Sequence, residues 1–120
     1  MPHTAAHSAM SADMKKCSEE CLSCSTTCTE TVHHCLHMGG KHVEPAHLTS
    51  LIDCAEICQT SANVLLRGSS LHTETCRTCA AVCRACEASC RQIEGEEMKR
   101  CADACGRCAE SCERMAAMAS

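Results

Sequence analysis

Residues 76–90 read CRTCAAVCRACEASC, and the spacing of the cysteines in this stretch decides the fold. The thiols follow one another at alternating steps of three and four residues, at Cys76, Cys79, Cys83, Cys86 and Cys90. Because an α-helix turns once in about 3.6 residues, these steps keep every thiol on one stripe of a helix. The stripe occupies the a and d positions of a heptad, with cysteine in place of leucine.

The same spacing recurs along most of the chain. The other cysteines are Cys17, Cys21, Cys24, Cys28, Cys35, Cys54, Cys58, Cys101, Cys105, Cys108 and Cys112. Met14, Met38, Met98 and Met115 extend the stripes at their ends, and glycines, which commonly follow helix ends, separate them. We therefore predict four helices, at about 13–38, 45–67, 70–93 and 96–117, preceded by an N-terminal arm or short helix over 1–12.

Short connections between long helices favour antiparallel neighbours. The predicted fold is thus all-α, an up-down antiparallel four-helix bundle over residues 13–118 with a cysteine-lined core. The composition agrees with such a core, because the 120 residues include 16 cysteines and no Phe, Tyr or Trp. Free cysteine packs as a small hydrophobe, so thiols, alanine and methionine must fill the interior.

Charge and hydropathy exclude two classes of partner. The formal net charge is -4, with both signs mixed along the chain and no aromatic residues, which argues against nucleic-acid binding. No apolar run approaches the roughly 18 residues that a membrane span requires. The N-terminal residues lack the apolar stretch of a secretory signal, so we expect a cytoplasmic protein whose thiols are kept reduced.

The thiol stripes predict a site for many soft metal ions. Side chains three and four residues apart on a helix lie about 5–6 Å apart at Cβ, so two thiolates can share one small ion. Thiolate and thioether ligands select Cu(I), which accepts two or three sulfur ligands. Zinc requires four ligands in a closed tetrahedron, and a continuous ladder is a poor way to build isolated tetrahedra. The sequence favours sequestration of many Cu(I) ions by thiolates inside the bundle.

Three other readings of the cysteines stay open on the residues alone. One is a general sink for thiophilic ions such as zinc or cadmium. A second is a thiol redox or iron–sulfur protein, although the CxxC pairs lie within helices and no strand pattern accompanies them. A third is a structural bundle whose cysteines only pack; in that case leucine, isoleucine and valine should share the stripes, as Leu51 and Leu65 do in the second helix.

Several motifs resemble those of the bacterial cytosolic copper storage proteins. They are the CxxxCxxCxxxC runs at 17–28 and 101–112, HCLHMGGKH at 34–42 and DCAEICQTSA at 53–62. The resemblance, over about residues 13–115, implies a four-helix bundle filled with Cu(I), storage rather than catalysis, and association into homotetramers. Separately from the resemblance, we expect proteins that donate or accept copper among the partners of a copper store. Ser61 and Leu65 leave the second half of helix two without thiols, which shortens the expected copper column on that side.

The histidines point to an entrance for copper. Five of the eight lie between residues 33 and 47, around the first connection between helices. The bundle topology places them at the same end as Met98. As ligands at this entrance we predict His34, His42, His47, Met38 and Met98, with His34, His42 and His47 matching the family's motif. We expect Leu65 and Leu71 to close the opposite end.

Overall fold

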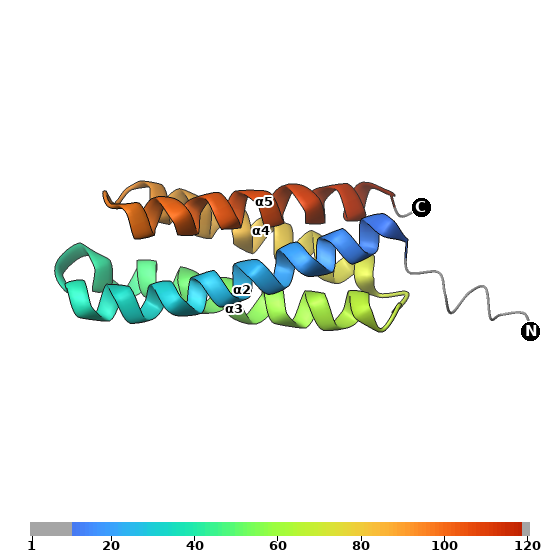
Figure 1. The fold of residues 1–120 in the computed structure, drawn as a ribbon, viewed down its shortest axis with the longest axis horizontal. Helices are drawn as coiled ribbons and strands as arrows, with labels where there is room; N and C mark the ends of the chain where they lie inside the picture. The colour runs from blue at the N-terminus through green and yellow to red at the C-terminus, as the bar shows by residue number, and fades with distance from the viewer. Residues whose placement is uncertain (1–10, 119–120) are drawn as a thin grey trace, which may run out of the picture.

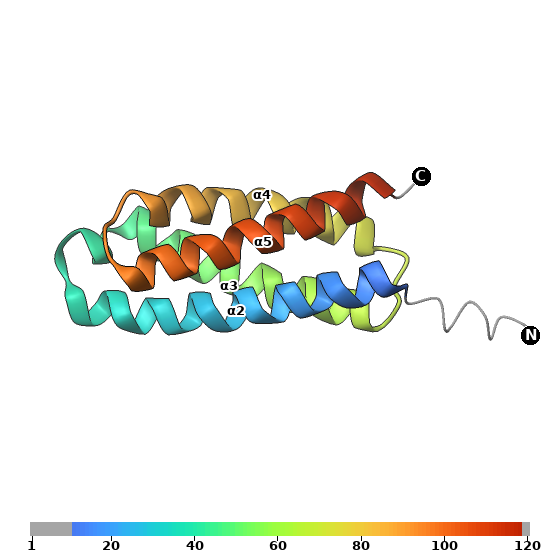
Figure 2. The same ribbon diagram turned by 45° about the horizontal axis from the view of Figure 1, so that its top comes forward.

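The computed structural model describes residues 11–118, which leaves most of the predicted N-terminal arm outside the described residues. Its elements are α2 (Ala12–Met38), a short 3-10 helix η1 (Gly40–Val43), α3 (Pro45–Leu66), α4 (His72–Arg91) and α5 (Glu96–Met118). The long helices alternate in direction, and the 38–45 and 91–96 connections share one end of the molecule (Figure 1). Each long helix packs against two others in the closed ring α2–α3–α4–α5 (Figure 2). This arrangement confirms the predicted all-α four-helix bundle.

Local sequence signals explain where the helices begin and end. The Ser11 hydroxyl accepts a hydrogen bond from the Met14 backbone N–H at 3.1 Å and caps α2. Gly39 ends the same helix with a φ of 71°, a left-handed conformation that favours glycine. Pro45 occupies the first turn of α3, where its missing N–H costs nothing. The connection between these helices contains η1, a turn of 3-10 helix that the sequence did not predict.

Helix α4 is shorter than the predicted range of 70–93. At its start the Ser69 hydroxyl accepts from the Leu71 N–H at 3.1 Å, and the Ser69 carbonyl accepts from His72 Nδ1 at 2.8 Å. These bonds form a turn, so Ser69 shapes the connection and the helix begins at His72. At its end the N–H groups of Gln92 and Ile93 donate to carbonyls three residues earlier, those of Ser89 and Cys90. This is the hydrogen-bond pattern of a 3-10 turn, so the α-helix ends before these residues.

The outer surface is charged, and the interface between α4 and α5 carries ion pairs. Arg84 on α4 donates two hydrogen bonds to the Glu113 carboxylate on α5, at 2.8 and 2.9 Å. Arg91 reaches Asp103 at 3.1 Å in the same interface. In the described part of the chain, no helix combines the length and the apolar character that crossing a bilayer demands.

Candidate metal centre

The interior of the bundle is a column of thiols. Every cysteine is unpaired and has no solvent-exposed surface. The column contains Cys17, Cys21, Cys24, Cys28 and Cys35 of α2, Cys54 and Cys58 of α3, Cys76, Cys79, Cys83, Cys86 and Cys90 of α4, and Cys101, Cys105, Cys108 and Cys112 of α5. The alternating steps of three and four residues thus turn all the predicted thiol ligands inward.

Thiols from different helices lie in contact across the core. Cys58 Sγ of α3 is 3.5 Å from Cys83 Sγ of α4 and 3.7 Å from Cys108 Sγ of α5. Cys24 Sγ of α2 lies 3.8 Å from Cys54 Sγ of α3. Contacts of this length let sulfur atoms from several helices bind one ion together.

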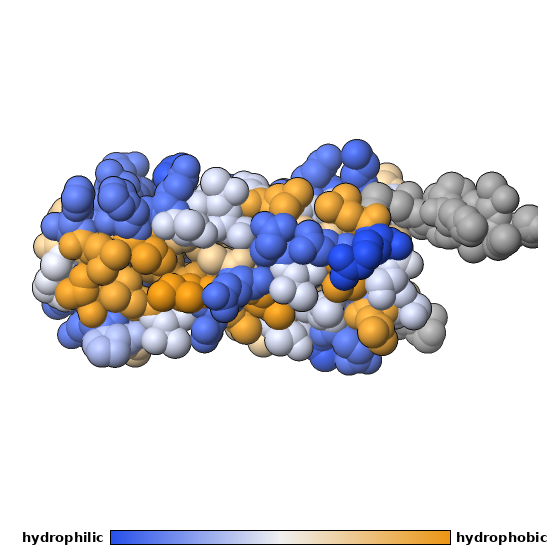
Figure 3. All heavy atoms as spheres, turned by 90° about the horizontal axis from the view of Figure 1, so that it is seen from below, coloured by the Kyte–Doolittle hydropathy of each residue, from blue (hydrophilic) through white to orange (hydrophobic). Residues whose placement is uncertain are grey.

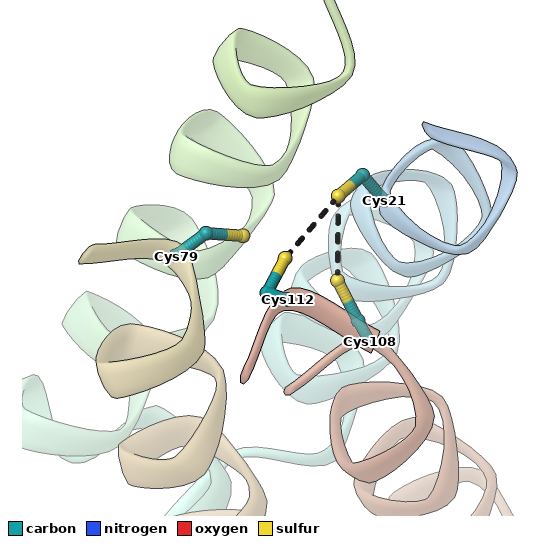
Figure 4. A group of neighbouring side chains, drawn as sticks. All are labelled: Cys21, Cys79, Cys108 and Cys112. Atoms are coloured by element: carbon teal, nitrogen blue, oxygen red, sulfur yellow. Dashed lines mark hydrogen bonds between the residues drawn. The ribbon is translucent and has the colours of Figure 1, made fainter. Parts of the chain in front are cut away.

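The thiols gather into groups whose sulfur atoms all lie within 4.8 Å of one another. Figure 4 shows one group, in which Cys21 of α2 points toward Cys108 and Cys112 of α5, at 3.7 Å from each sulfur, with Cys79 of α4 opposite. The groups are Cys21, Cys79, Cys108 and Cys112; Cys24, Cys28, Cys54 and Cys105; Cys24, Cys58, Cys83 and Cys108; Cys28, Cys86, Cys101 and Cys105; and Cys17, Cys76 and Cys112.

Neighbouring groups share members. Cys24, Cys28, Cys105, Cys108 and Cys112 each belong to two groups. The groups therefore cannot all hold an ion with its own private set of thiolates. Simultaneous occupancy requires sulfur atoms that bridge two ions.

The protons of the column are held collectively. Hydrogen bonds with Cys101 and Cys105 raise the pKa of Cys28, and burial raises it further. Hydrogen bonds from the same two thiols lower the pKa of Cys86, because they stabilise its thiolate form. The thiols of one group thus influence one another's ionisation, and an incoming cation displaces protons from a hydrogen-bonded network rather than from isolated side chains.

A different set of donors lies at the end where α2 stops and α3 begins. The Cys35 sulfur is 3.5 Å from His47 Nε2 and 3.9 Å from Met98 Sδ. All three side chains are buried, with Cys35 and Met98 at 0% exposure. Burial raises the pKa of the Cys35 thiol to about 11 and lowers that of the His47 imidazole, so both groups are neutral near pH 7. We call Cys35, His47 and Met98 the mixed trio.

The remaining predicted ligands at this end lie outside the mixed trio. The rings of His34 and His42 meet edge to face with centroids 5.6 Å apart, and His34 Nε2 is 3.9 Å from a Glu97 carboxylate oxygen. His42 Nε2 is buried and has no hydrogen-bond partner among the described residues. Met38 is 58% exposed at the end of α2, so its thioether faces solvent.

The opposite end is apolar. Leu65 and Met115 are buried there, and the Ser61 hydroxyl lies 3.8 Å from the Cys76 sulfur. Leu65 therefore closes this end as predicted. The same prediction was wrong for Leu71, which is 63% exposed because it precedes the first turn of α4 rather than pointing into the bundle.

Two residues near the mixed trio were missed from the sequence. The Ser89 hydroxyl lies 2.8 Å from His47 Nδ1, and Glu97 faces His34. Ser89 precedes Cys90 on α4 and Glu97 precedes Met98 on α5, so each lies beside a stripe rather than on it. Only the relative positions of the helices bring them to the histidines, and the spacing within one helix carries no such signal.

The chain is similar to one known protein family and to several solved structures. The family model described as copper storage protein matches residues 10–117. A protein from Nitrosospira multiformis, Nmul_A1745, has a crystal structure with a TM-score of 0.85 at 45% identity, covering 88% of this chain and 96% of that one. No curated protein sequence matches.

Two further similar structures are those of copper storage proteins. The Cu(I)-bound copper storage protein BsCsp3 matches with a TM-score of 0.82 at 30% identity, covering 87% of this chain and 98% of that one. A cytosolic copper storage protein from Streptomyces lividans, described with five coppers, matches with a TM-score of 0.76 at 31% identity, over 88% and 92% of the two chains. Because the family model covers nearly the whole bundle, the chain belongs to the copper storage protein family.

Proposed function

We propose that this chain stores copper as many Cu(I) ions held by the thiolates of the column. Membership of the family makes it a metal store rather than an enzyme. Each of the 16 cysteines is proposed as a ligand. Copper is the cargo of the protein, so filling and emptying of the column constitute its activity.

The sharing of thiols between groups carries this proposal. A divalent ion with four thiolates of its own would leave a net negative charge in the core, and burying net charge is very costly. One Cu(I) per thiolate leaves no net charge, and Cu(I) is satisfied by the two or three sulfur ligands that a bridged arrangement gives it. Shared thiolates thus suit a chain of Cu(I) ions better than separate tetrahedral zinc sites.

An anaerobic titration of the reduced protein with Cu(I), against a competing chelator, tests the proposal. Charge balance predicts saturation at roughly 16 ions per chain, with a few more where histidine and methionine sites fill. Saturation at about one to four tight ions would indicate a discrete site instead. The same titration with Zn(II) or Cd(II) should stop earlier, since each of these ions requires more thiolate charge.

Two other readings predict different observations. An iron–sulfur protein would be coloured when isolated, and a redox enzyme would cycle between a dithiol and a disulfide. A bundle with purely structural cysteines would bind little metal. Binding of many Cu(I) ions without colour or disulfide formation separates storage from all of these.

The bundle should fold before copper arrives. Protonated thiols are small and apolar, so they fill the core without unpaired charge. We expect the reduced apo protein to give a helical circular dichroism spectrum, and copper to raise its melting temperature because the organised ligands exist only in the folded state. A random-coil spectrum that becomes helical only with copper would contradict this order of events.

The proposed entrance is the end that contains the mixed trio, together with His34, His42 and Met38 as outer ligands. An ion passing from a donor protein into the core needs a ligand at every step. Imidazole and thioether groups provide such steps here, whereas buried Leu65 closes the other end.

The proposed location is cytosolic, where thiols are kept reduced, and the Streptomyces lividans relative is described as cytosolic. We also propose that bundles associate into homotetramers. Exposed Leu36 of α2 and Ile52 of α3 support association, and the side of the molecule seen from below carries apolar patches (Figure 3). Light scattering coupled to size exclusion tests it: a tetramer is expected, and a monomer at micromolar concentration would rule it out.

A further inference from the structure

Two cysteines stand outside the groups formed by thiols alone. All the thiols belong to these groups except Cys35 and Cys90. Cys35 instead contacts one imidazole nitrogen and one thioether sulfur, at 3.5 and 3.9 Å. One thiolate with two neutral donors matches the single charge of one Cu(I) ion, so the mixed trio has the composition of a one-ion site.

Non-ligating side chains separate the mixed trio from the column on two of the four helices. On α2, Thr31 occupies the stripe position between Cys28 and Cys35; it is 2% exposed, and its hydroxyl donates to the Thr27 carbonyl at 2.7 Å. On α3, Leu51 occupies the position between His47 and Cys54 and has no exposed surface. Neither side chain offers a soft ligand to Cu(I).

The connection to the column therefore runs along α4 and α5. On α4 the stripe steps directly from Cys86 to Cys90, and on α5 it steps directly from Met98 to Cys101, so no non-ligating side chain interrupts it there. Cys101 Sγ lies 3.8 Å from Cys28 Sγ, and both belong to the thiol group of the column that is nearest this end. An ion leaving the mixed trio thus meets Cys90 and Cys101 before Cys28 of α2 or Cys54 of α3.

Ser89 fixes the orientation of the imidazole. Its hydroxyl lies 2.8 Å from His47 Nδ1, and the opposite nitrogen, Nε2, faces the Cys35 sulfur. With the hydrogen on Nδ1, the ring donates to Ser89 Oγ and presents the Nε2 lone pair toward Cys35. A partner of this kind sets the tautomer and the ring orientation of a metal-binding histidine.

We propose that Ser89 is a positioning residue that makes Cys35, His47 and Met98 a separate exchange site for one Cu(I) ion, through which ions pass to Cys90 and Cys101. This rests on the proposed function of the column as the copper store. During transfer the ion stays Cu(I): its bonds to imidazole, thioether and Cys35 break as bonds to the receiving thiolates form. The proton displaced from a receiving thiol returns to Cys35.

Nuclear magnetic resonance of the ¹⁵N-labelled protein tests the site directly, since Cu(I) is diamagnetic. Long-range ¹H–¹⁵N correlations distinguish the two ring nitrogens of His47. We expect the Nε2 resonance to shift only in the last steps of a Cu(I) titration, because the sites made of thiolates alone fill first. Copper on Nδ1, or an unchanged His47 spectrum at full loading, would overturn the proposal.

The role of Ser89 is tested by Ser89→Ala, Ser89→Thr and, as a matched control, Ser61→Ala. Ser61 is a buried serine beside a thiol at the opposite end. Loss of a partner that orients a ligand should slow uptake from a Cu(I)–chelator complex about tenfold in Ser89→Ala. Ser89→Thr, which keeps the hydroxyl, should restore the rate, and Ser61→Ala should match the wild type. Wild-type uptake by Ser89→Ala would overturn the positioning role.

Failure of this proposal and failure of copper storage give different results. If the column does not store copper, the wild type and every variant saturate at a few ions. If only the exchange site is wrong, capacity stays at its full value in every variant, while the rates and the His47 spectrum do not respond to Ser89.

Discussion

Buried side chains fill both ends of the bundle, but the chemistry of these side chains differs. At the end that joins α2 to α3, buried Cys35, His47 and Met98 offer sulfur and nitrogen donors. At the opposite end, buried Leu65 and Ser61 occupy the stripe of α3 in place of ligands, beside the thioether of buried Met115. Packing requires only that both ends exclude water, so the donors at one end are not explained by stability.

The contrast separates two demands that the core meets at once. Thiols along the whole length satisfy packing and storage together, because a protonated thiol is a small hydrophobe and a thiolate is a ligand. At the ends the two demands diverge, since leucine packs without binding and histidine binds at a cost in desolvation. The burial that lowers the pKa of His47 is that cost.

The largest expected effect compares the ends as packing. Met98 is 0% exposed and Met115 is 4% exposed, so Met98→Ala and Met115→Ala each remove a buried side chain. Each should lower the free energy of unfolding of the apo protein by about 2–5 kcal/mol. Urea denaturation of the reduced proteins measures both losses. A loss confined to one end would show that the ends are not equivalent in packing.

The next effect compares the ends as routes for copper. The variant His42→Ala/His47→Ala/Met98→Ala should take up Cu(I) at least about tenfold more slowly, a barrier increase of about 1.4 kcal/mol, while its final capacity changes little. His72→Ala/Met115→Ala should load at nearly the wild-type rate. Stopped-flow uptake from a Cu(I)–chelator complex, at matched protein concentration, makes the comparison. Slow loading by the second variant alone would place the entrance at the other end.

A smaller effect follows from the Cys35 thiol. Burial raises its pKa from 9.0 to about 11, so the folded protein keeps a proton that the unfolded chain releases. The resulting stability is fully present below pH 9.0 and is lost as the pH rises toward about 11. Denaturation of the apo protein across this window should therefore show a steeper loss for the wild type than for Cys35→Ala. Parallel curves would mean that Cys35 titrates normally.

The smallest effect adds a ligand to the apolar end. Ser61 lies 3.8 Å from the Cys76 sulfur, so Ser61→Cys places a new thiol beside the three-thiol group of Cys17, Cys76 and Cys112. Charge balance predicts about one additional Cu(I) at saturation and an unchanged rate of uptake. Native mass spectrometry resolves a difference of one ion. An unchanged capacity would show that the column ends before this position.

The sequence predicts the helices and the inward direction of all the thiols because both depend on spacing within one helix. Which thiols meet across the core depends on how the helices are shifted along one another, and that shift is a product of packing. The contacts of Cys58 with Cys83 and Cys108 depend on this shift, and so does the contact of His47 with Ser89. Leu71 was misjudged for a related reason: a hydrogen-bonded turn at Ser69 delays the start of α4, so the residue never joins the stripe.

The length of the column affects the order in which copper ions enter and leave it. The column runs between long helices: α2 alone has 27 residues, which span about 40 Å. The proposed entrance is at one end of this column only. A narrow container with one opening empties in the reverse of the order in which it fills. If ions enter and leave only through this end, copper taken up first lies deepest and is returned last, so the position of an ion in the column determines how long it is retained.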